Sequence, residues 1–572
     1  MGSRLRARAI SLLGLGLLIT SVGVSCGSKN AATDPLDGSS PAGDGAPTGS
    51  DGSNGSDGSV GPVPSVGASV LQRGNDIYRR ATYVQPALTV AAVTAMAPDT
   101  TFNTNATFPA NGMTTTQGQA SVLYLESGPA QAGCPTGATG CTATTRAAGA
   151  GVFFAFPPLG SNPNIVAFDE TTGSPVWTAH VGTGGDGIRG TPVVDPDSRR
   201  VYVVTGGDPH VVRAISVDDG TEVTTGGWPV TLSATTLTAS GQTFNSRDQN
   251  QRGALLLLNH ILYIPFGGHF GDGGNYRGWI VAVDTADPTH FVGWTTQSAR
   301  SGIWGSGGLA SDGTYVFATT GDVKNVARSA SDSEEVLRVQ GMAEFKRDPA
   351  SVFVPTESPA WDATDFDFGA STPAFVPLPA GSNPPSLLVA PAKAGRLYVL
   401  DGSNLSSGTY PATGGELANL IVANPASESM YTSPTIYTSA SGLHAVINAG
   451  DGAKTYCPGG GPDSQEMIIS VLLQPGKTPI ATEVWCAANA GGRKLNYPPI
   501  STTTDDAGGN AIVWFMSGGQ LTAVDGDTGQ KLVTTTGASC DMVPSMSFPI
   551  AVKNRIVVFA LGHLCSWSID GK

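Results

Sequence analysis

The chain has 572 residues, of which 76 are glycine, 40 are proline and only 13% are charged. Its formal net charge is −14 and its sequence pI is near 4.9. A negative charge of this size opposes binding to phosphate backbones and to anionic lipid headgroups, so nucleic acid is excluded as the expected partner. Short runs rich in Val, Ile and Tyr alternate with turn clusters, which is typical of an all-β protein.

Residues 1–26 have the features of a secretory signal. Three arginines within the first eight residues precede an almost uncharged run, residues 9–20, and small residues then lead to Cys26. This ending resembles a bacterial lipobox, in which Cys26 would be lipidated and become the mature N-terminus, with Gly23 where Leu is usual. A simple cleaved signal, or an uncleaved anchor with an incidental cysteine, is the alternative.

Residues 27–70 form a tract of Gly, Ser, Asp and Pro with almost nothing apolar to bury, which predicts a disordered linker. Such a tether would let a folded body sit tens of ångströms, in order of magnitude, from a lipid anchor. The Gly after Cys26 resembles the sorting pattern of outer-membrane lipoproteins. We therefore expect attachment to the bacterial cell envelope at the outer membrane, on either its periplasmic or its surface side.

A repeated unit organises the rest of the chain. Residues 165–177 read IVAFDETTGSPVW and residues 521–533 read LTAVDGDTGQKLV, with looser copies at 214–223, 280–285 and 397–405. Such recurrence indicates an architectural repeat before it indicates a catalytic motif. The Asp-x-x-Thr-Gly turn needs an Asp side chain that bonds nearby backbone and a Gly at positive φ, while the Trp packs between neighbouring units. The residues assigned this structural role are Asp169, Thr172, Gly173, Trp177, Asp525 and Gly529.

Residues 71–572 contain strand pairs separated by turns and show no long helical period. The units predict one β-propeller of four-stranded antiparallel blades, with eight blades favoured and seven as the alternative. Residues 547–569 supply only about three strands, and a spare strand stands at the start of the domain. We therefore predict that an N-terminal strand closes the ring.

These repeats resemble the pyrroloquinoline-quinone-like (PQQ-like) propeller repeat. The run QRGALLLLNHILYIPFGGHFGDGGNYRGWIVAVD, followed by GIWGSGG, DFDFGASTP and AKAGRLYVLDGSNL, is similar to secreted proteins of the quinoprotein alcohol dehydrogenase-like superfamily. The resemblance implies the fold, and its members include both quinoprotein dehydrogenases and cofactor-free scaffolds. Catalytic members use Ca²⁺, a carboxylate base, an aromatic floor and often a disulfide of adjacent cysteines. This sequence has neither adjacent cysteines nor a CxxCH haem motif.

Two sets of residues are candidates for a ligand or metal site. The ligand-binding candidates, which stand in a Gly-rich loop or in the segments that best match the superfamily, are Arg252, His269, Asp272, Trp279 and Trp304. The alternative is that these residues hold loops together and pack between blades. Asp365 and Asp367 alternate on an expected strand, so both would face one side and could bind a metal such as Ca²⁺. A solvated turn or a structural pair is the alternative.

Six cysteines remain besides Cys26, an even number in an exported chain, where disulfides persist. Local pairing predicts three disulfides, Cys134 with Cys141, Cys457 with Cys486, and Cys540 with Cys565. Free buried cysteines are the alternative.

The expected function is that of a noncatalytic, lipid-anchored, monomeric propeller that carries no cofactor and serves as a binding or scaffold module for a protein or a polysaccharide. The alternative is a dehydrogenase of alcohols or sugars that uses PQQ and Ca²⁺. Function is to be sought where the repeats break down, at residues 134–141, at residues 325–335 and in the loop around His269.

Overall fold

The computed structural model describes residues 69–108, 120–132, 144–147, 149–159, 162–182, 187–323, 332–342, 346–405, 412–428, 430–450, 457, 467–489, 498–535, 540, 543 and 546–571. For 144, 158–159, 162–163 and 346–351 it describes the backbone only. All of them belong to one compact unit, Asp57–Lys572. The signal, Cys26 and the linker up to residue 68 lie outside the described residues.

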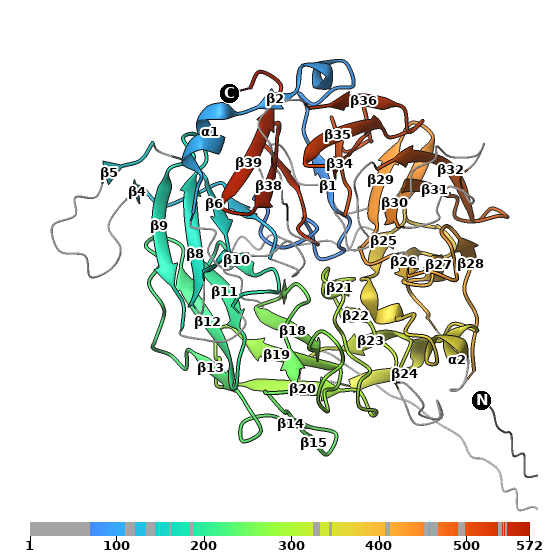
Figure 1. Ribbon diagram of the computed structural model, residues 1–572. Coiled ribbons are helices and arrows are strands. Elements are labelled where there is room, and N and C mark those ends of the chain that lie inside the picture. Colours follow the sequence, from blue (N-terminus) through green and yellow to red (C-terminus); the bar gives the residue numbers. More distant parts are fainter. Residues whose placement is uncertain are drawn as a thin grey trace, which may run out of the picture. The chain divides into compact units, whose positions relative to one another are not determined.

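Eight antiparallel sheets follow one another around a ring, which confirms the propeller and its eight blades (Figure 1). From the axis outward, blades 1 to 4 contain β3 (Leu123–Leu125), β6 (Val152–Ala155), β8 (Asn162–Asp169), β9 (Pro175–His180); β10 (Val193–Asp195), β11 (Arg200–Thr205), β12 (His210–Ser216), β13 (Val230–Leu232); β17 (Leu256–Leu258), β18 (Ile261–Gly268), β19 (Trp279–Asp284), β20 (Phe291–Thr295); and β21 (Ala310–Ser311), β22 (Tyr315–Thr319), β23 (Val336–Gln340), β24 (Lys346–Phe353).

Blades 5 to 8 continue the ring back to the first blade. They contain β25 (Ala374–Pro377), β26 (Ser386–Ala392), β27 (Arg396–Asp401), β28 (Ala418–Ile421); β29 (Thr435–Ser439), β30 (Gly442–Ala449), β31 (Met467–Leu473), β32 (Ala481–Ala488); β33 (Ile500–Thr503), β34 (Ile512–Ser517), β35 (Gln520–Asp525), β36 (Lys531–Thr534); and β37 (Ile550–Val552), β38 (Arg555–Ala560), β39 (His563–Ser568), β2 (Ala97–Pro98).

Short elements connect or extend the blades. They are η1 (Ala92–Ala95), α1 (Thr100–Asn105), α2 (Ser358–Trp361), η3 (Phe368–Ala370), the hairpins β4 (Gln131–Ala132) with β5 (Thr144–Thr145) and β14 (Thr238–Ala239) with β15 (Gln242–Thr243), and the added strands β7 (Pro158–Leu159) and β16 (Gln249–Asn250). Among the described residues, no helix combines the length and the apolar character needed to cross a membrane.

An N-terminal strand closes the ring, as the sequence predicts. β2 pairs antiparallel with β39 and supplies the outermost strand of blade 8. A second N-terminal strand, β1 (Thr82–Val84), pairs in parallel with β33 on the axial edge of blade 7. The closing strand has two residues and the axial strand has three, so the chain contributes to blades 7 and 8 before it builds blade 1.

Apolar side chains fill the spaces between neighbouring blades. Successive side chains of a strand point to opposite faces, so each blade contributes to the cluster before it and to the cluster after it. Separate buried clusters lie between blades 1 and 2, 2 and 3, 3 and 4, 4 and 5, 5 and 6, and 6 and 7, while one larger cluster joins blades 7, 8 and 1. Blade-to-blade burial therefore stabilises the whole ring.

The turns of the two most similar repeats, residues 165–177 and 521–533, contain the same hydrogen bonds between side chain and backbone. Asp169 Oδ1 accepts hydrogen bonds from the backbone N–H and the hydroxyl of Thr172, and Gly173 has φ of +70°. The indole of Trp177 donates to the carbonyl of Val217 at 2.8 Å, which ties blade 1 to blade 2. At the second copy, Asp525 Oδ1 accepts the same pair of bonds from Thr528, and Gly529 has φ of +71°.

An axial segment, residues 70–85, runs through the centre of the ring and contacts every blade. Its backbone and side chains share hydrogen bonds with one residue at or beside each innermost strand, namely Tyr124, Val194, Leu255, Ser311, Phe375, Ile436, Ser501 and Ala551. Because these partners belong to blades 1 to 8 in turn, the segment fixes all eight innermost strands around a common core.

Candidate functional site

Most of the predicted site residues meet at one face of the ring. In antiparallel blades, the loop that leads into the innermost strand and the loop that joins the second strand to the third lie at the same end. We call the face where the innermost strands begin the top face, and the opposite one the bottom face. Loops that lead into blades 3, 4 and 5 bring the predicted Arg252, Trp304, Asp365 and Asp367 to the top face. The two aspartates lie in a loop and not on the strand that the sequence predicted, because the chain turns at Asp365.

Lys393, in the turn between β26 and β27, lies at the centre of this group. Its Nζ atom is 3.3 Å from Asp365 Oδ1, 3.3 Å from Asp367 Oδ2 and 3.5 Å from Glu428 Oε1. Burial lowers the pKa of Lys393, but the carboxylates, led by Asp367, outweigh burial and hold that pKa above its ordinary value. One ammonium group therefore links the loop into blade 5 with the loop into blade 6.

Aromatic rings extend the group toward blade 3. The ring centroid of Trp304 lies 6.4 Å from that of Tyr431, and the Lys393 ammonium lies 5.6 Å from the Tyr431 ring. On the other side, the guanidinium of Arg252 lies 5.6 Å from the Trp304 ring. Trp304 and Arg252 are partly exposed, whereas Tyr431 is buried. We call Arg252, Trp304, Asp322, Asp365, Asp367, Lys393 and Tyr431 the top-face cluster.

Three carboxylates of this cluster are close enough to share a cation. Asp322, Asp365 and Asp367 each place one oxygen within 4.8 Å of the others, and Asp367 Oδ1 accepts the backbone N–H of Asp322 at 3.0 Å. Oxygen ligands of this kind suit hard cations such as Ca²⁺. In the structure, the Lys393 ammonium supplies positive charge beside two of the three carboxylates.

A fourth carboxylate is buried next to the cluster. Glu334 Oε2 accepts the backbone N–H of Phe368 at 2.6 Å, and the side chain is fully buried. Burial raises the pKa of Glu334 well above its usual range, and the nearby Asp367 carboxylate adds to the effect. The neutral form of Glu334 is therefore favoured, and the negative charge at this point of the top face is that of the aspartates.

The remaining predicted ligand residues have local roles. His269 Nε2 lies 3.2 Å from the carbonyl oxygen of Arg247, and Asp272 Oδ1 accepts the hydroxyl of Tyr276 at 2.7 Å, so both side chains shape the Gly-rich loop. Trp279 lies in β19, fully buried against Phe244 in the core between blades 2 and 3. Its side chain therefore contributes to interblade packing and does not reach the top face.

Sequence reasoning missed two residues of this face. Phe270, at the tip of the same Gly-rich loop, is 94% exposed, the highest value among the large apolar residues that the structure describes. Lys393 was visible in the turn before the repeat LYVLDGSNL, but its carboxylate partners come from other loops. The only sequence signal for Lys393 was that a lysine is unusual at this position of a repeat turn.

The bottom face contains two cavities. The larger, of about 420 Å³, lies between blades 5, 6 and 7 and is mainly apolar, with Leu378, Leu443 and Leu473 in its wall and Arg80 of the axial segment beside them. The smaller, of about 110 Å³, lies where blade 8 meets blade 1.

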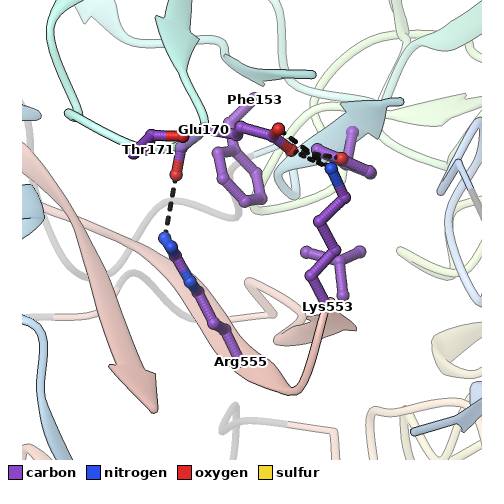
Figure 2. A pocket seen from close by; sticks show the side chains of 7 residues that line it. Phe153, Glu170, Thr171, Lys553 and Arg555 are labelled. Carbon is purple, nitrogen blue, oxygen red and sulfur yellow. Dashed lines mark hydrogen bonds and ion pairs between the residues drawn. The ribbon is translucent and has the colours of Figure 1, made fainter. Parts of the chain in front are cut away.

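Figure 2 shows the smaller cavity, in which Lys553 Nζ lies 2.7 Å from Glu170 Oε2 and Arg555 donates to the carbonyl oxygen of Glu170 at 2.8 Å. The pKa of Glu170 is lowered, because its bonds to Lys553 and Tyr124 outweigh the effect of burial. These contacts join the last blade to the first.

Two disulfides are present at predicted positions, Cys457–Cys486 in blade 6 and Cys540–Cys565 in blade 8. Cys134 and Cys141, and the insertion between them, lie outside the described residues. Of residues 325–335, the other segment in which the repeats break down, only residues 332–335 are described.

The chain has the fold of known quinoprotein dehydrogenases. It is similar to quinohemoprotein alcohol dehydrogenase from Comamonas testosteroni at 13% identity and a TM-score of 0.56, with 88% of this chain and 81% of that chain covered. It is likewise similar to a europium-containing methanol dehydrogenase at 13% identity and a TM-score of 0.56, with 86% and 90% covered. No family model matches the sequence, and neither does any curated protein. At these identities the likeness establishes the fold alone.

Proposed function

We propose that this chain, which has the fold of the quinoprotein alcohol dehydrogenases, is a noncatalytic propeller of the bacterial cell envelope whose top-face cluster binds a polysaccharide. One observation carries the proposal: the partly exposed Trp304 lies against the Arg252 guanidinium and near Tyr431, whose ring the Lys393 ammonium approaches. An indole face packs against the apolar face of a sugar ring, and charged groups hydrogen-bond to its hydroxyls. The acidic surface favours a neutral or cationic polymer over an anionic one.

A second candidate function, a quinone-dependent dehydrogenase of alcohols or sugars, is favoured by the carboxylates of Asp322, Asp365 and Asp367. Their oxygens fit a hard cation by chemistry and spacing. Asp365, which is 42% exposed, is the carboxylate best placed to accept a proton from a substrate hydroxyl, with Lys393 Nζ orienting it. A bound quinone would supply the two-electron acceptor. The indole of Trp304 would provide a flat surface on which the quinone ring could stack.

One set of measurements separates the two functions. Purified protein is incubated with PQQ and either Ca²⁺ or Eu³⁺, and quinone absorbance and dye reduction are followed with alcohols and aldoses. In parallel, affinity electrophoresis measures retardation by neutral and basic polysaccharides. Retardation without dye reduction supports the binding function, and substrate-dependent dye reduction overturns it.

Trp304→Ala tests whether the top-face cluster carries the binding. The variant should weaken polysaccharide retardation at least about fivefold, because one aromatic contact of this kind is worth about 1 kcal/mol or more. Trp228→Ala is the matched control, since Trp228 is also partly exposed but stacks on Tyr202 in blade 2. An equal loss in both variants would contradict a top-face site.

Attachment to the envelope is proposed from the sequence alone. Lipidated Cys26 would hold the propeller at the outer membrane through the linker. Metabolic labelling with a radioactive fatty acid should mark the wild-type chain and not Cys26→Ala. Equal labelling of both chains, or of neither, would contradict lipidation at Cys26.

A further inference from the structure

Two buried guanidinium groups lie in the axial segment and differ in how many of their nitrogen atoms have hydrogen-bond acceptors. Arg79 donates to the carbonyl oxygens of Arg73, Leu255 and Leu309, so all of its nitrogen atoms have acceptors. Arg73 is only 3% exposed and donates to two hydroxyls, Ser121 Oγ at 3.1 Å and Ser306 Oγ at 3.2 Å. Its Nε atom has no hydrogen-bond partner.

Other buried donors near the axial segment also lack acceptors. The hydroxyls of Tyr83, Ser433 and Ser547 are buried and have no partner. Ser547 precedes Phe548, whose ring lies 4.9 Å from the Arg73 guanidinium and whose backbone N–H donates to Ser121 Oγ.

Ser433 lies beside the loop that contains Ser306. A Cβ atom placed on Gly307, the neighbour of Ser306, would stand 2.1 Å from Ser433 Oγ. Hydroxyls of blades 1 and 4 therefore contact the guanidinium, and unmatched hydroxyls of blades 6 and 8 belong to, or lie beside, neighbours of residues that contact it.

Within the described part of the chain, the positive charge at this point has no carboxylate partner. Among the residues that the structure describes, no salt bridge reaches Arg73 or Arg79, and the nearby Asp76 carboxylate is bound by Arg80 at 2.7 Å. Burial, together with the charge of Arg79, lowers the pKa of Arg73 to about 9. A buried charge is costly unless an opposite charge or hydrogen bonds offset it.

We propose that a small monovalent anion, such as a halide ion or a carboxylate, binds on the propeller axis between Arg73 Nε–H and the hydroxyls of Tyr83, Ser433 and Ser547. Every unmatched group named here can donate a hydrogen bond, and the centre is cationic, which is the chemistry of an anion site. Water would satisfy the donors, but only an anion would also offset the charge. A monovalent anion fits because burying a divalent one costs more.

The bound anion would complete the attachment of the axial segment. It would connect Arg73 with blades 6 and 8, whereas the observed hydrogen bonds of its guanidinium reach blades 1 and 4. Stability of the ring would then depend on the anion present in solution, through the preferential stabilisation of the folded state by a bound ligand.

The test measures thermal unfolding of the purified protein while bromide, chloride or acetate replaces gluconate at constant ionic strength. The wild-type protein should show a saturable rise in Tm with bromide, and a bromide-soaked crystal should show an anomalous peak within hydrogen-bond distance of Arg73 Nε. A response to acetate alone would assign the site to the carboxylate of an organic ligand. Absence of any saturable response overturns the proposal.

Variants decide whether the response comes from this site. Ser433→Ala combined with Ser547→Ala should raise the apparent Kd for bromide at least about tenfold, because each lost bond to a charged group is worth about 1.5 kcal/mol or more. Arg73→Met should abolish the response if the variant folds. Ser566→Ala removes a hydroxyl that is also buried and unmatched but belongs to β39, so it is the matched control. An unchanged Kd in the double variant overturns the proposal.

Discussion

Replacing Lys393 with methionine should destabilise the propeller, and the loss should depend on pH. The side chains of Lys393 and Asp367 are 6% and 9% exposed, and their charged atoms lie 3.3 Å apart. At an effective dielectric constant of about 20, that separation corresponds to an attraction of about 5 kcal/mol. Desolvation of the ammonium group offsets part of it, and removing one partner of a buried pair costs about 3 to 5 kcal/mol. We expect a loss of about 3 kcal/mol at pH 7.

The direction of the pH dependence follows from the groups involved. The folded-state pKa of Lys393 is raised, so the contribution of its charge is complete below the ordinary lysine pKa of 10.5 and disappears only as pH rises through the folded value. The loss caused by Lys393→Met should therefore stay the same up to about pH 10 and shrink at higher pH, where the ammonium group of the wild-type chain loses its proton.

Urea unfolding followed by tryptophan fluorescence at pH 7 and at about pH 11 measures the loss on both sides of the ordinary lysine pKa. Lys531→Met is the matched control, since Lys531 is exposed on β36, and it should change stability by less than about 0.5 kcal/mol. A loss below about 1 kcal/mol for Lys393→Met at pH 7, or an equal loss at both pH values, would refute the reasoning.

Three further changes test other parts of the fold and the site. Burial lowers the pKa of His444 to about 4, so the unfolded chain takes up a proton below pH 6.5 while the folded one stays neutral. Stability should fall by up to about 3 kcal/mol between pH 7 and 4, and His444→Gln should flatten that slope in chemical denaturation. Replacing both Cys540 and Cys565 with serine opens a link across a sequence separation of 25 and should cost about 3 kcal/mol by the same assay; an unchanged midpoint would contradict it. Phe270→Ala should leave stability within about 0.5 kcal/mol and weaken polysaccharide retardation, and full retardation would exclude Phe270 from the binding surface.

The blades were predictable because their signals are local. The turn at Asp169 is formed by bonds to Thr172, three residues away, and strand alternation needs only neighbouring positions. Ring closure was also predictable, since residues 547–569 contain too few strands for a complete blade. The sequence alone therefore determined the fold class and the way in which the ring closes, and it favoured eight blades over seven, a choice that the structure made.

The site was less predictable because its residues meet only after the ring has formed. Arg252, Trp304 and the two aspartates at 365 and 367 were selected from separate segments, and the tertiary structure brought them to one face around Lys393. Trp279 resembled a ligand residue in sequence, but its alternation along β19 directs it into the core.

The position of the axial segment and its contacts with the blades could be known only from the tertiary structure. No local pattern shows that Thr82 bonds to Ser501 across 419 residues, or that Arg79 satisfies carbonyl groups 176 and 230 residues away. The repeats depend on contacts between residues close in sequence, and such contacts can be recognised in the sequence itself. The centre of the ring depends on contacts between residues far apart in sequence, which form only once eight blades enclose the same axis.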